Sequence, residues 1–289
     1  MNERLERMLE GRVASVEPVV GGGYTQATRL RVSLDDGRSV FVKGAVDAAT
    51  ADWLRLEHVV YANVEGPFLP HFVGYDESEG LPLLALEDLS AAHWPPPWRD
   101  GDVDAARTAL SALGETRAPS GVTPAGAWKD EWVAGWRAVA DDPEPFLSTG
   151  VASREWLDAH RASLEAAATR APLEDGDALL HLDVRSDNTA IAERGALLVD
   201  WNWASSGNAL MDAVAWAPSL CRETGMRPEE VVDADGAGEL AALVAGVWAH
   251  TAGSPPPPTA APGLREAQRE LLAICLPWAC RLLGIPEPE

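Results

Sequence analysis

A run of three prolines divides the chain into two parts with different sequence patterns. The run lies in Trp94–Trp98 (WPPPW), and a segment this poor in backbone N–H groups cannot continue a helix or a central strand. Before it, apolar residues alternate as in β-strands. After it, they recur mainly at helical spacing. The sequence therefore predicts a β-rich part, a connecting segment and a mainly helical part.

The first part is expected to form antiparallel strands with one inserted helix. Asp36 and Gly37 lie between two β-rich segments, and this dipeptide indicates a hairpin because it tolerates the positive φ of a tight turn. An apolar stripe at helical spacing predicts a helix over about 48–63. The predicted strands cover residues 12–20, 28–34, 39–45, 72–75 and 81–86.

The second part is expected to be helical with two short strands. This pattern predicts an α+β fold with a β-rich domain over 1–88, a linker over 89–101 and a helical domain over 102–289. The main predicted helices cover 103–116, 128–140, 154–170 and 263–283, and the short strands cover 178–184 and 196–199.

The net charge of −22 narrows the classes of partner. It argues against a nucleic-acid partner, because phosphate backbones need clustered Lys and Arg. It would attract a cationic substrate, but a solubilising acidic surface is the more general explanation, and we favour it. No apolar run reaches membrane-spanning length and no secretion signal is visible. We therefore expect a soluble cytoplasmic protein without a membrane partner.

The most informative polar segment is HLDVRSDN, from His181 to Asn188, followed twelve residues later by Asp200. Phosphoryl transfer needs a carboxylate to orient the acceptor hydroxyl and oxygen ligands to hold Mg²⁺ against nucleotide phosphates. The order His-x-Asp, then Asn, then Asp is the order found in kinases. The alternative is a polar loop with a solvated Asp and a capping Asn. The upstream Lys43 favours the kinase interpretation.

With these residues the chain resembles the aminoglycoside phosphotransferase family, small-molecule kinases related in fold to protein kinases. The resemblance covers nearly the whole chain in element order and is most specific over residues 181–203. It implies a bilobal protein-kinase-like fold that uses ATP and Mg²⁺. It also implies that Asp183 is the catalytic carboxylate, that Asn188 and Asp200 are the Mg²⁺ ligands, and that His181 holds the loop through hydrogen bonds.

Arg185 departs from the family pattern, which has histidine at this place in most members. A cation two residues after Asp183 could stabilise negative charge on the transferred phosphoryl group, and a guanidinium could bind two of its oxygens. A salt bridge to Asp187 or Asp183 that only shapes the loop is the alternative. The sequence leaves both open.

Lys43 lies in a predicted strand that is otherwise largely apolar, so it needs a partner if it is buried. Glu57, on the following helix, is the expected partner, and Asp52 and Glu65 are competitors. Together Lys43 and Glu57 would hold the α- and β-phosphates of ATP.

Two further segments are expected to contact the nucleotide. The loop containing Gly22, Gly23 and Tyr24 could bring backbone N–H groups close to phosphates, although a plain flexible hairpin fits equally well. By the family resemblance, backbone groups from Glu87 to Leu89 would bind the adenine edge. An edge strand with a charged end is the alternative there. The resemblance also identifies a structural Asp that fixes the catalytic loop, at position 212.

The acceptor is expected to be a hydroxyl group of a small molecule. After Asp200 the long activation segment of protein kinases is missing, which disfavours a protein acceptor. An aminoglycoside or other antibiotic, a sugar and a choline-like metabolite are all compatible. Trp128, Trp132 and Trp136 repeat at helical spacing and are expected to be mostly core. The tryptophans expected nearer the acceptor are Trp94, Trp98, Trp201 and Trp203.

Two other classes of function stay open at this point. The chain could bind a nucleotide without turnover, or act on a peptide within a biosynthetic complex. A metallohydrolase is a poor fit, because His181 has no second histidine at ligand spacing.

Overall fold

The computed structural model describes residues 2–19, 27–257 and 263–289, which form two compact units. Unit 1 comprises Met1–Val122 and Ser186–Ser205, and unit 2 comprises Thr123–Arg185 and Ser206–Glu289. Unit 1 thus extends beyond the predicted β-rich domain of 1–88, because a helix and a later hairpin group with its sheet. The predicted boundaries between the β-rich lobe, the linker and the helical lobe stay a prediction.

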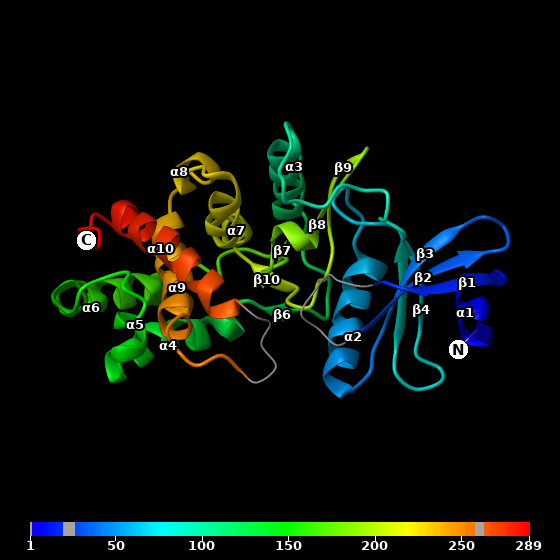
Figure 1. Cartoon of the computed structure of the whole chain (residues 1–289), viewed down its shortest axis with the longest axis horizontal. Coiled ribbons are helices and arrows are strands. Elements are labelled where there is room, and N and C mark those ends of the chain that lie inside the picture. The colour runs from blue at the N-terminus through cyan, green and yellow to red at the C-terminus, as the bar shows by residue number, and fades with distance from the viewer. Residues whose placement is uncertain (1, 20–26, 258–262) are drawn as a thin grey trace. The chain divides into compact units, whose positions relative to one another are not determined.

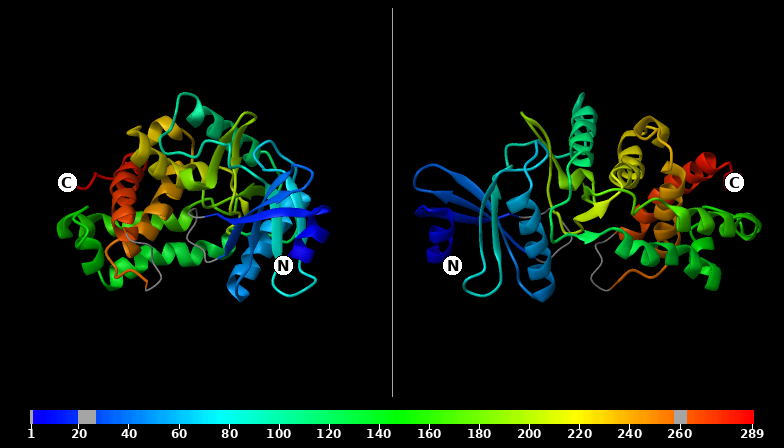
Figure 2. Two further views of the ribbon diagram at one scale, coloured as in Figure 1. Left: turned by 45° about the vertical axis from the view of Figure 1, so that its right-hand side comes forward. Right: turned by 180° about the vertical axis from the view of Figure 1, so that it is seen from behind.

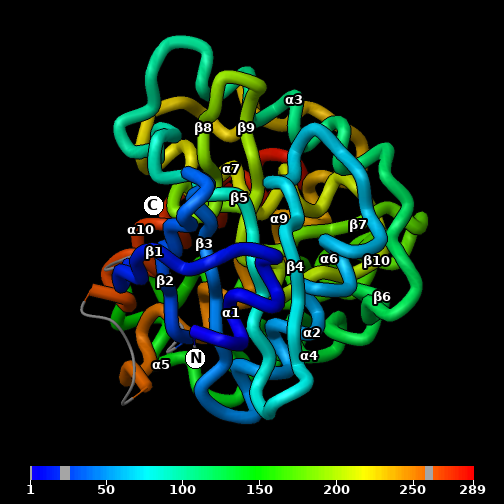
Figure 3. Tube along the Cα trace, turned by 90° about the vertical axis from the view of Figure 1, so that its right-hand side faces the viewer, coloured from blue at the N-terminus to red at the C-terminus, as the bar shows by residue number. Residues whose placement is uncertain are grey.

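Unit 1 is built on a five-stranded antiparallel sheet with the order β1-β2-β3-β5-β4 (Figure 1 and Figure 3). The turn between β2 and β3 contains Gly37 at φ 88°, and Leu34 N–H donates to Arg38 O at 2.9 Å. The predicted hairpin is therefore confirmed. The strands are β1 (Val13–Pro18), β2 (Thr28–Leu34), β3 (Ser39–Gly44), β4 (Phe72–Asp76) and β5 (Leu83–Glu87).

One face of this sheet is apolar and is covered by α1 (Asn2–Leu9), a helix that the sequence did not predict. Figure 3 shows α1 crossing in front of the strands. Side chains alternate between the faces of a strand, so every second residue of β2 and β3 enters this cluster. Its fully buried members are Leu5, Leu9, Val32, Leu34, Val40, Val42, Leu83 and Ala85.

The helix α2 (Ala48–Asn63) follows β3 and has the predicted bounds. Its start is fixed by a capping box, in which Thr50 N–H donates to Asp47 Oδ1 at 2.8 Å and Asp47 N–H donates to Thr50 Oγ1 at 3.0 Å. Its buried side includes Leu54, Val60 and also Glu57. A carboxylate on the buried side of a helix requires a partner.

The later segment of unit 1 forms a second, smaller sheet. A 3-10 turn (Ser186–Asn188) leads into the hairpin of β8 (Thr189–Ala192) and β9 (Gly195–Leu198). Helix α3 (Asp102–Gly114) packs against both strands. The proline run, which has no regular structure as predicted, is fastened by hydrogen bonds between His93 and Ile191.

Unit 2 is mainly helical, and Figure 2 shows it from two further sides. Helix α9 (Ala237–Thr251) is apolar on nearly all sides and packs against α4 (Gly126–Asp141), α6 (Arg154–Arg170) and α10 (Leu264–Leu283). Helices α4 and α9 approach closely at Gly135 and Gly246, where a Cβ on Gly135 would lie 2.2 Å from the Gly246 carbonyl oxygen. The other elements are α5 (Glu144–Leu147), α7 (Leu210–Thr224), α8 (Pro228–Val231) and a three-stranded sheet of β6 (Thr123–Pro124), β10 (Ser205–Gly207) and β7 (Ala178–Leu180).

The arrangement confirms the predicted α+β class, with a β-rich N-terminal part and a mainly helical C-terminal part. Within the described ranges, no helix combines the length and the apolar composition that crossing a membrane requires.

Candidate functional site

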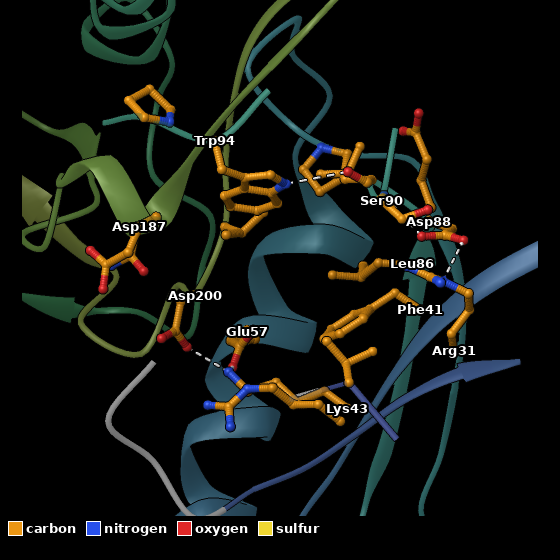
Figure 4. A pocket seen from close by; sticks show the side chains of 18 residues that line it. Arg31, Phe41, Lys43, Glu57, Leu86, Asp88, Ser90, Trp94, Asp187 and Asp200 are labelled. Atoms are coloured by element: carbon orange, nitrogen blue, oxygen red, sulfur yellow. Dashed lines mark hydrogen bonds and ion pairs between the residues drawn. The ribbon is translucent and has the colours of Figure 1, made fainter. Parts of the chain in front are cut away.

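Unit 1 contains a pocket of about 420 Å³ on the sheet face opposite α1, a volume in the range of small-molecule sites. In Figure 4, Lys43, Glu57 and Asp200 lie together at one end, and Arg31 and Asp88 lie at the other. The lining comes from β2, β3, α2, the end of β5 with the segment after it, and both sides of the β8–β9 hairpin. It includes Arg29, Arg31, Phe41, Lys43, Glu57, Leu86, Glu87, Asp88, Leu89, Trp94, Asp187, Asn188 and Asp200.

The first end of the pocket is organised around Lys43, which is buried in the sheet at 5% exposure. Its Nζ donates to Glu57 Oε1 at 2.5 Å and also contacts Asp200 Oδ1. Of the three acidic residues that the sequence offered, Glu57 is the one that Lys43 contacts, and Asp52 instead pairs with Arg55 at 2.7 Å. The structure therefore brings Lys43 together with Glu57, which is 14 positions later in the sequence, and with Asp200, which is 157 positions later.

The charges at this end do not cancel among these three residues. Burial alone would lower the pKa of Lys43, but the carboxylates of Glu57 and Asp200 outweigh it and raise that pKa above its usual value. Burial raises the pKa of Glu57 to about 7, and the neighbouring Lys43 ammonium only partly opposes this. The two carboxylates thus keep Lys43 charged, and Arg29 in the same pocket acts on Glu57 as a second cation.

The β8–β9 hairpin places Asn188 and Asp200 at the same end of the pocket. Asn188 directly precedes β8 and Asp200 follows β9, and at this open end Val199 N–H donates to Asn188 O at 3.0 Å. Asp200 has φ 69°, a conformation that few residues other than Gly, Asn and Asp adopt readily. Asn202 Nδ2 donates to Asp200 Oδ1 at 2.7 Å and helps to orient it.

Oxygen donors of this kind fit Mg²⁺, which usually takes one or two carboxylates and completes its shell with substrate phosphates and water. In the part of the chain that the structure describes, no three His, Cys, Asp or Glu side chains form a metal cluster of their own. Asn188 and Asp200, with Asp187 beside them in the pocket lining, fit a magnesium ion that arrives with a nucleotide.

The other end of the pocket is formed by the segment after β5. Glu87 and Leu89 both line the pocket, as the adenine-edge prediction requires. The Glu87 carboxylate, however, is bound to both outer nitrogens of Arg194, and its backbone N–H donates to His71 O at 2.9 Å, so neither group faces a ligand. Trp94 Nε1 donates to the Leu89 carbonyl oxygen at 3.3 Å, which holds the indole at the pocket wall.

Asp183 lies in unit 2, on a loop whose backbone is held by a buried carboxylate. Asp212, at the start of α7, accepts the N–H groups of His181 and Leu182, each at 2.7 Å. Leu182 has φ 60°, so the chain turns there and the predicted strand 178–184 ends at Leu180. The prediction that Asp212 fixes this loop is confirmed.

His181 and Arg185 both contact Asp183. His181 is fully buried, and its Nδ1 accepts the Asp183 N–H at 3.3 Å. Arg185 Nε lies 3.3 Å from Asp183 Oδ1, and both side chains are about 30% exposed. This is one of the two salt bridges that the sequence offered as the alternative to a catalytic role. The contact leaves a role of Arg185 toward phosphate untested.

Some residues predicted for the site lie away from it. Others lie outside the residues that the structure describes. Gly22, Gly23 and Tyr24 lie outside the described residues. Trp201 was expected near the acceptor, and this was wrong, because it is fully buried, packs against Phe68 and donates from Nε1 to Leu198 O. Of the tryptophans predicted to be core, Trp136 is fully buried and Trp132 is partly buried against the same cluster.

Sequence reasoning missed Arg29, Phe41 and Asp187 as pocket residues. A signal for Arg29 and Phe41 was present. The hairpin is centred on Asp36, so residues equally distant from it pair, and Arg29 lies opposite Lys43. Phe41 shares the face of Lys43 because it lies two residues before it.

Comparison with known proteins was informative only at the level of structure. In sequence, no family model and no curated protein matches the chain. An aminoglycoside phosphotransferase from Alicyclobacillus acidocaldarius subsp. acidocaldarius DSM 446 superimposes with a TM-score of 0.60 at 16% identity, over 96% of this chain and 94% of that chain. Wild-type aminoglycoside 2'-phosphotransferase-IIIa, solved as a GDP complex, gives 0.58 at 16% identity over 94% and 92%.

A third similar structure is spectinomycin phosphotransferase APH(9)-Ia, solved with ADP and spectinomycin. It gives a TM-score of 0.56 at 11% identity, over 94% of this chain and 92% of that chain. The chain therefore has the kinase-like fold of the aminoglycoside phosphotransferases, and the fold inferred from residues 181–203 and the element order is confirmed.

Proposed function

We propose that this chain is a kinase that transfers the γ-phosphoryl group of ATP to a hydroxyl group of a small molecule. The observation that carries the proposal is the pocket of unit 1, where Lys43, Glu57, Asn188 and Asp200 gather. The fold supports it, because structures of the same fold are phosphotransferases that were solved with ADP or GDP. The order of chemical groups in kinases supplies the roles.

In this proposal the two ends of the pocket hold different parts of the nucleotide. Lys43, kept charged and in place by Glu57, binds the α- and β-phosphates. Backbone groups of Glu87 and Leu89 receive the edge of the base, beside the rings of Phe41 and Trp94. Asn188 and Asp200 hold Mg²⁺, which neutralises charge on the β- and γ-phosphates when it is bound.

Asp183 orients the acceptor hydroxyl and accepts its proton. The contacts of its loop support this role, because Asp212 accepts the N–H groups of the two residues before it and His181 accepts its own N–H, which reduces the motion of the carboxylate. Arg185, which contacts Asp183, stabilises charge on the transferred phosphoryl group.

The acceptor is proposed to be a small molecule, with antibiotics of the aminoglycoside and spectinomycin classes as the first candidates. Spectinomycin is bound in one structure of this fold. A sugar or another hydroxyl-bearing metabolite is equally compatible with the chemistry of Asp183.

The test is release of ADP from MgATP, and of GDP from MgGTP, with a panel of aminoglycosides, spectinomycin and simple sugars. Asp183→Asn should lower kcat by about 10²- to 10⁴-fold, the usual contribution of a general base. Its Kd for ATP should stay within about twofold of wild type, since Asp183 is not assigned to the nucleotide pocket. Asp175→Asn, at an exposed position in the same unit, is the matched control and should leave kcat unchanged.

Two outcomes would contradict the proposal. Near wild-type turnover in Asp183→Asn would remove Asp183 from the reaction. Tight ATP binding with no ADP release, with any acceptor or with water, would instead support a nucleotide-binding protein without turnover.

A further inference from the structure

The pocket contains a second cation, Arg29, that the proposed function leaves without a role. Strands β2 and β3 are antiparallel, and Arg29 lies directly opposite Lys43 in their register. Their neighbours Leu30 and Val42 point to the apolar side under α1, so Arg29 and Lys43 share the opposite face. Both residues line the pocket.

Two like charges directly opposite each other in a sheet are unfavourable unless counter-charges lie between or beside them. Here Glu57 and Asp200 supply two carboxylates next to Lys43. Burial raises the pKa of Glu57, and Lys43 and, more weakly, Arg29 act against that rise. Arg29 is therefore close enough to influence the same buried carboxylate that Lys43 contacts.

A nearby arginine on the same strand shows that position, and not only charge, distinguishes Arg29. Arg31 also lines the pocket, but two residues along β2, which is about 7 Å. It forms an ion pair with Asp88 at 3.2 Å, at the opposite end of the pocket from Lys43 (Figure 4). The charge of Arg31 is thus balanced by a partner at the base end, whereas Arg29 lies at the Lys43 end.

Because Asp200 is also the proposed magnesium ligand, the balance of charge changes when a metal ion takes that carboxylate. Lys43 and Arg29 then keep Glu57 as a carboxylate that both of them influence, and two cations at this end attract phosphate. A planar guanidinium can bind two phosphate oxygens at once, whereas an ammonium acts as a point charge. Such a pair of cations is complementary to a polyphosphate.

We infer that Arg29 binds the phosphate chain of the nucleotide alongside Lys43, as a second phosphate-binding residue supplied by β2. The inference rests on the proposed function, because it requires a nucleotide in this pocket. It assigns β2 a direct part in recognising phosphate.

The test compares ligands with and without phosphates on the intact chain. Binding of ATP, ADP and adenosine is measured by isothermal titration calorimetry in the presence of Mg²⁺, for wild type and Arg29→Gln. The Kd for ATP should rise by about 10- to 100-fold, as expected for the loss of hydrogen bonds to a charged group, and the Kd for adenosine should stay within twofold. Arg29→Lys keeps the charge but not the planar fork, and its Kd for ATP should lie between the two.

Arg31→Gln is the matched control, on the same strand and the same face. It should change the Kd for ATP and the Kd for adenosine by the same factor, because Arg31 lies at the base end. The inference is overturned if Arg29→Gln binds ATP as well as wild type does, or if it loses adenosine and ATP equally. If Arg29→Gln does not fold, an Arg29→Lys variant with wild-type affinity for ATP overturns it.

The design separates this inference from the proposed function. A wild-type chain that binds neither ATP nor adenosine would remove both. A wild-type chain that binds ATP, together with an Arg29→Gln variant of equal affinity, would remove only the role of Arg29.

Discussion

The two units each bury a carboxylate, but they hold it in different ways. Glu57 in unit 1 and Asp212 in unit 2 are 1% and 2% exposed, and burial raises the pKa of each, to about 7 and about 6. Glu57 is stabilised by the Lys43 side chain, which it shares with Asp200. Asp212 is stabilised by two backbone N–H groups.

The difference shows what each carboxylate is suited for. A lysine side chain has several rotatable bonds and can exchange one carboxylate for a phosphate, so the Glu57 arrangement can rearrange around a ligand. Backbone N–H groups cannot leave Asp212 without moving the loop, so this arrangement fixes a conformation, including the positive φ of Leu182. The arrangement at Glu57 suits a binding site. The arrangement at Asp212 suits a loop that supports such a site.

The largest expected effect comes from removing the exchangeable partner. Lys43→Ala leaves the buried carboxylate of Glu57 and the partly buried carboxylate of Asp200 without this cation, and breaking a buried pair in this way costs about 3–5 kcal/mol. We expect the free energy of unfolding to fall by that amount in urea denaturation at pH 8. Lys129→Ala is the control, because Lys129 is partly exposed and lies 3.7 Å from an exposed Glu174, and it should lose less than about 1 kcal/mol. Equal losses in the two variants would show that the Lys43 pair is not effectively buried.

The raised pKa of Asp212 makes a defined contribution to the pH dependence of stability. Its pKa is about 6 in the folded chain against 3.8 for an ordinary Asp, so the folded state binds the extra proton between these values. The contribution of Asp212 to stability is therefore greatest below pH 3.8, falls as the pH rises to about 6, and is level above that. A shift of about two units corresponds to about 3 kcal/mol.

Asp212→Asn removes this titration and leaves the other groups in place. The difference in the free energy of unfolding between wild type and variant should therefore decrease by about 2 kcal/mol between pH 4 and pH 7. Urea denaturation of both proteins at the two pH values measures it. A difference that does not change with pH would mean that Asp212 has an ordinary pKa and that its backbone partners fully offset its burial.

The smallest effect is expected for an ion pair whose two side chains are partly exposed. The guanidinium of Arg194 binds the carboxylate of Glu87, with side chains 37% and 25% exposed. Arg194→Gln should lower the free energy of unfolding by less than about 1 kcal/mol, and by less still in 0.5 M NaCl, because salt screens exposed charges. A salt-independent loss of the size expected for Lys43→Ala would remove the distinction between exposed and buried pairs.

Much of the fold followed from local patterns. Helix α2 has its predicted bounds because Asp47 and Thr50 form a capping box at its start, and residue types of this kind are visible in a sequence. By contrast, β7 is shorter than predicted because the chain turns at Leu182 through a positive φ, which is enforced by the distant Asp212. An apolar residue gives no local signal of such a turn.

The residues of the candidate site that belong to a sequence motif could be predicted. Those whose place depends on the pairing of strands were harder to predict. Asp183, Asn188 and Asp200 follow from the order of residue types, although their roles stay proposals. The strand β8, whose hairpin with β9 puts Asn188 and Asp200 at one end, was missed because its residues (TAIA) lack the continuous apolar run that indicated β9. Arg29 was missed because its place depends on the register of β2 and β3 and not on its own neighbours in sequence.

That register has a consequence for the length of the turn from Asp35 to Arg38. Adding or deleting a single residue there would slip β2 against β3 and turn its side chains over, so that Leu30 would enter the pocket and Arg29 would meet the apolar cluster. The residues of this exposed turn can be replaced by others that accept its backbone angles. The number of residues in the turn, however, is constrained as strongly as the identity of a side chain that contacts a ligand. A transplanted hairpin would preserve the chemistry of the pocket only if it kept that count.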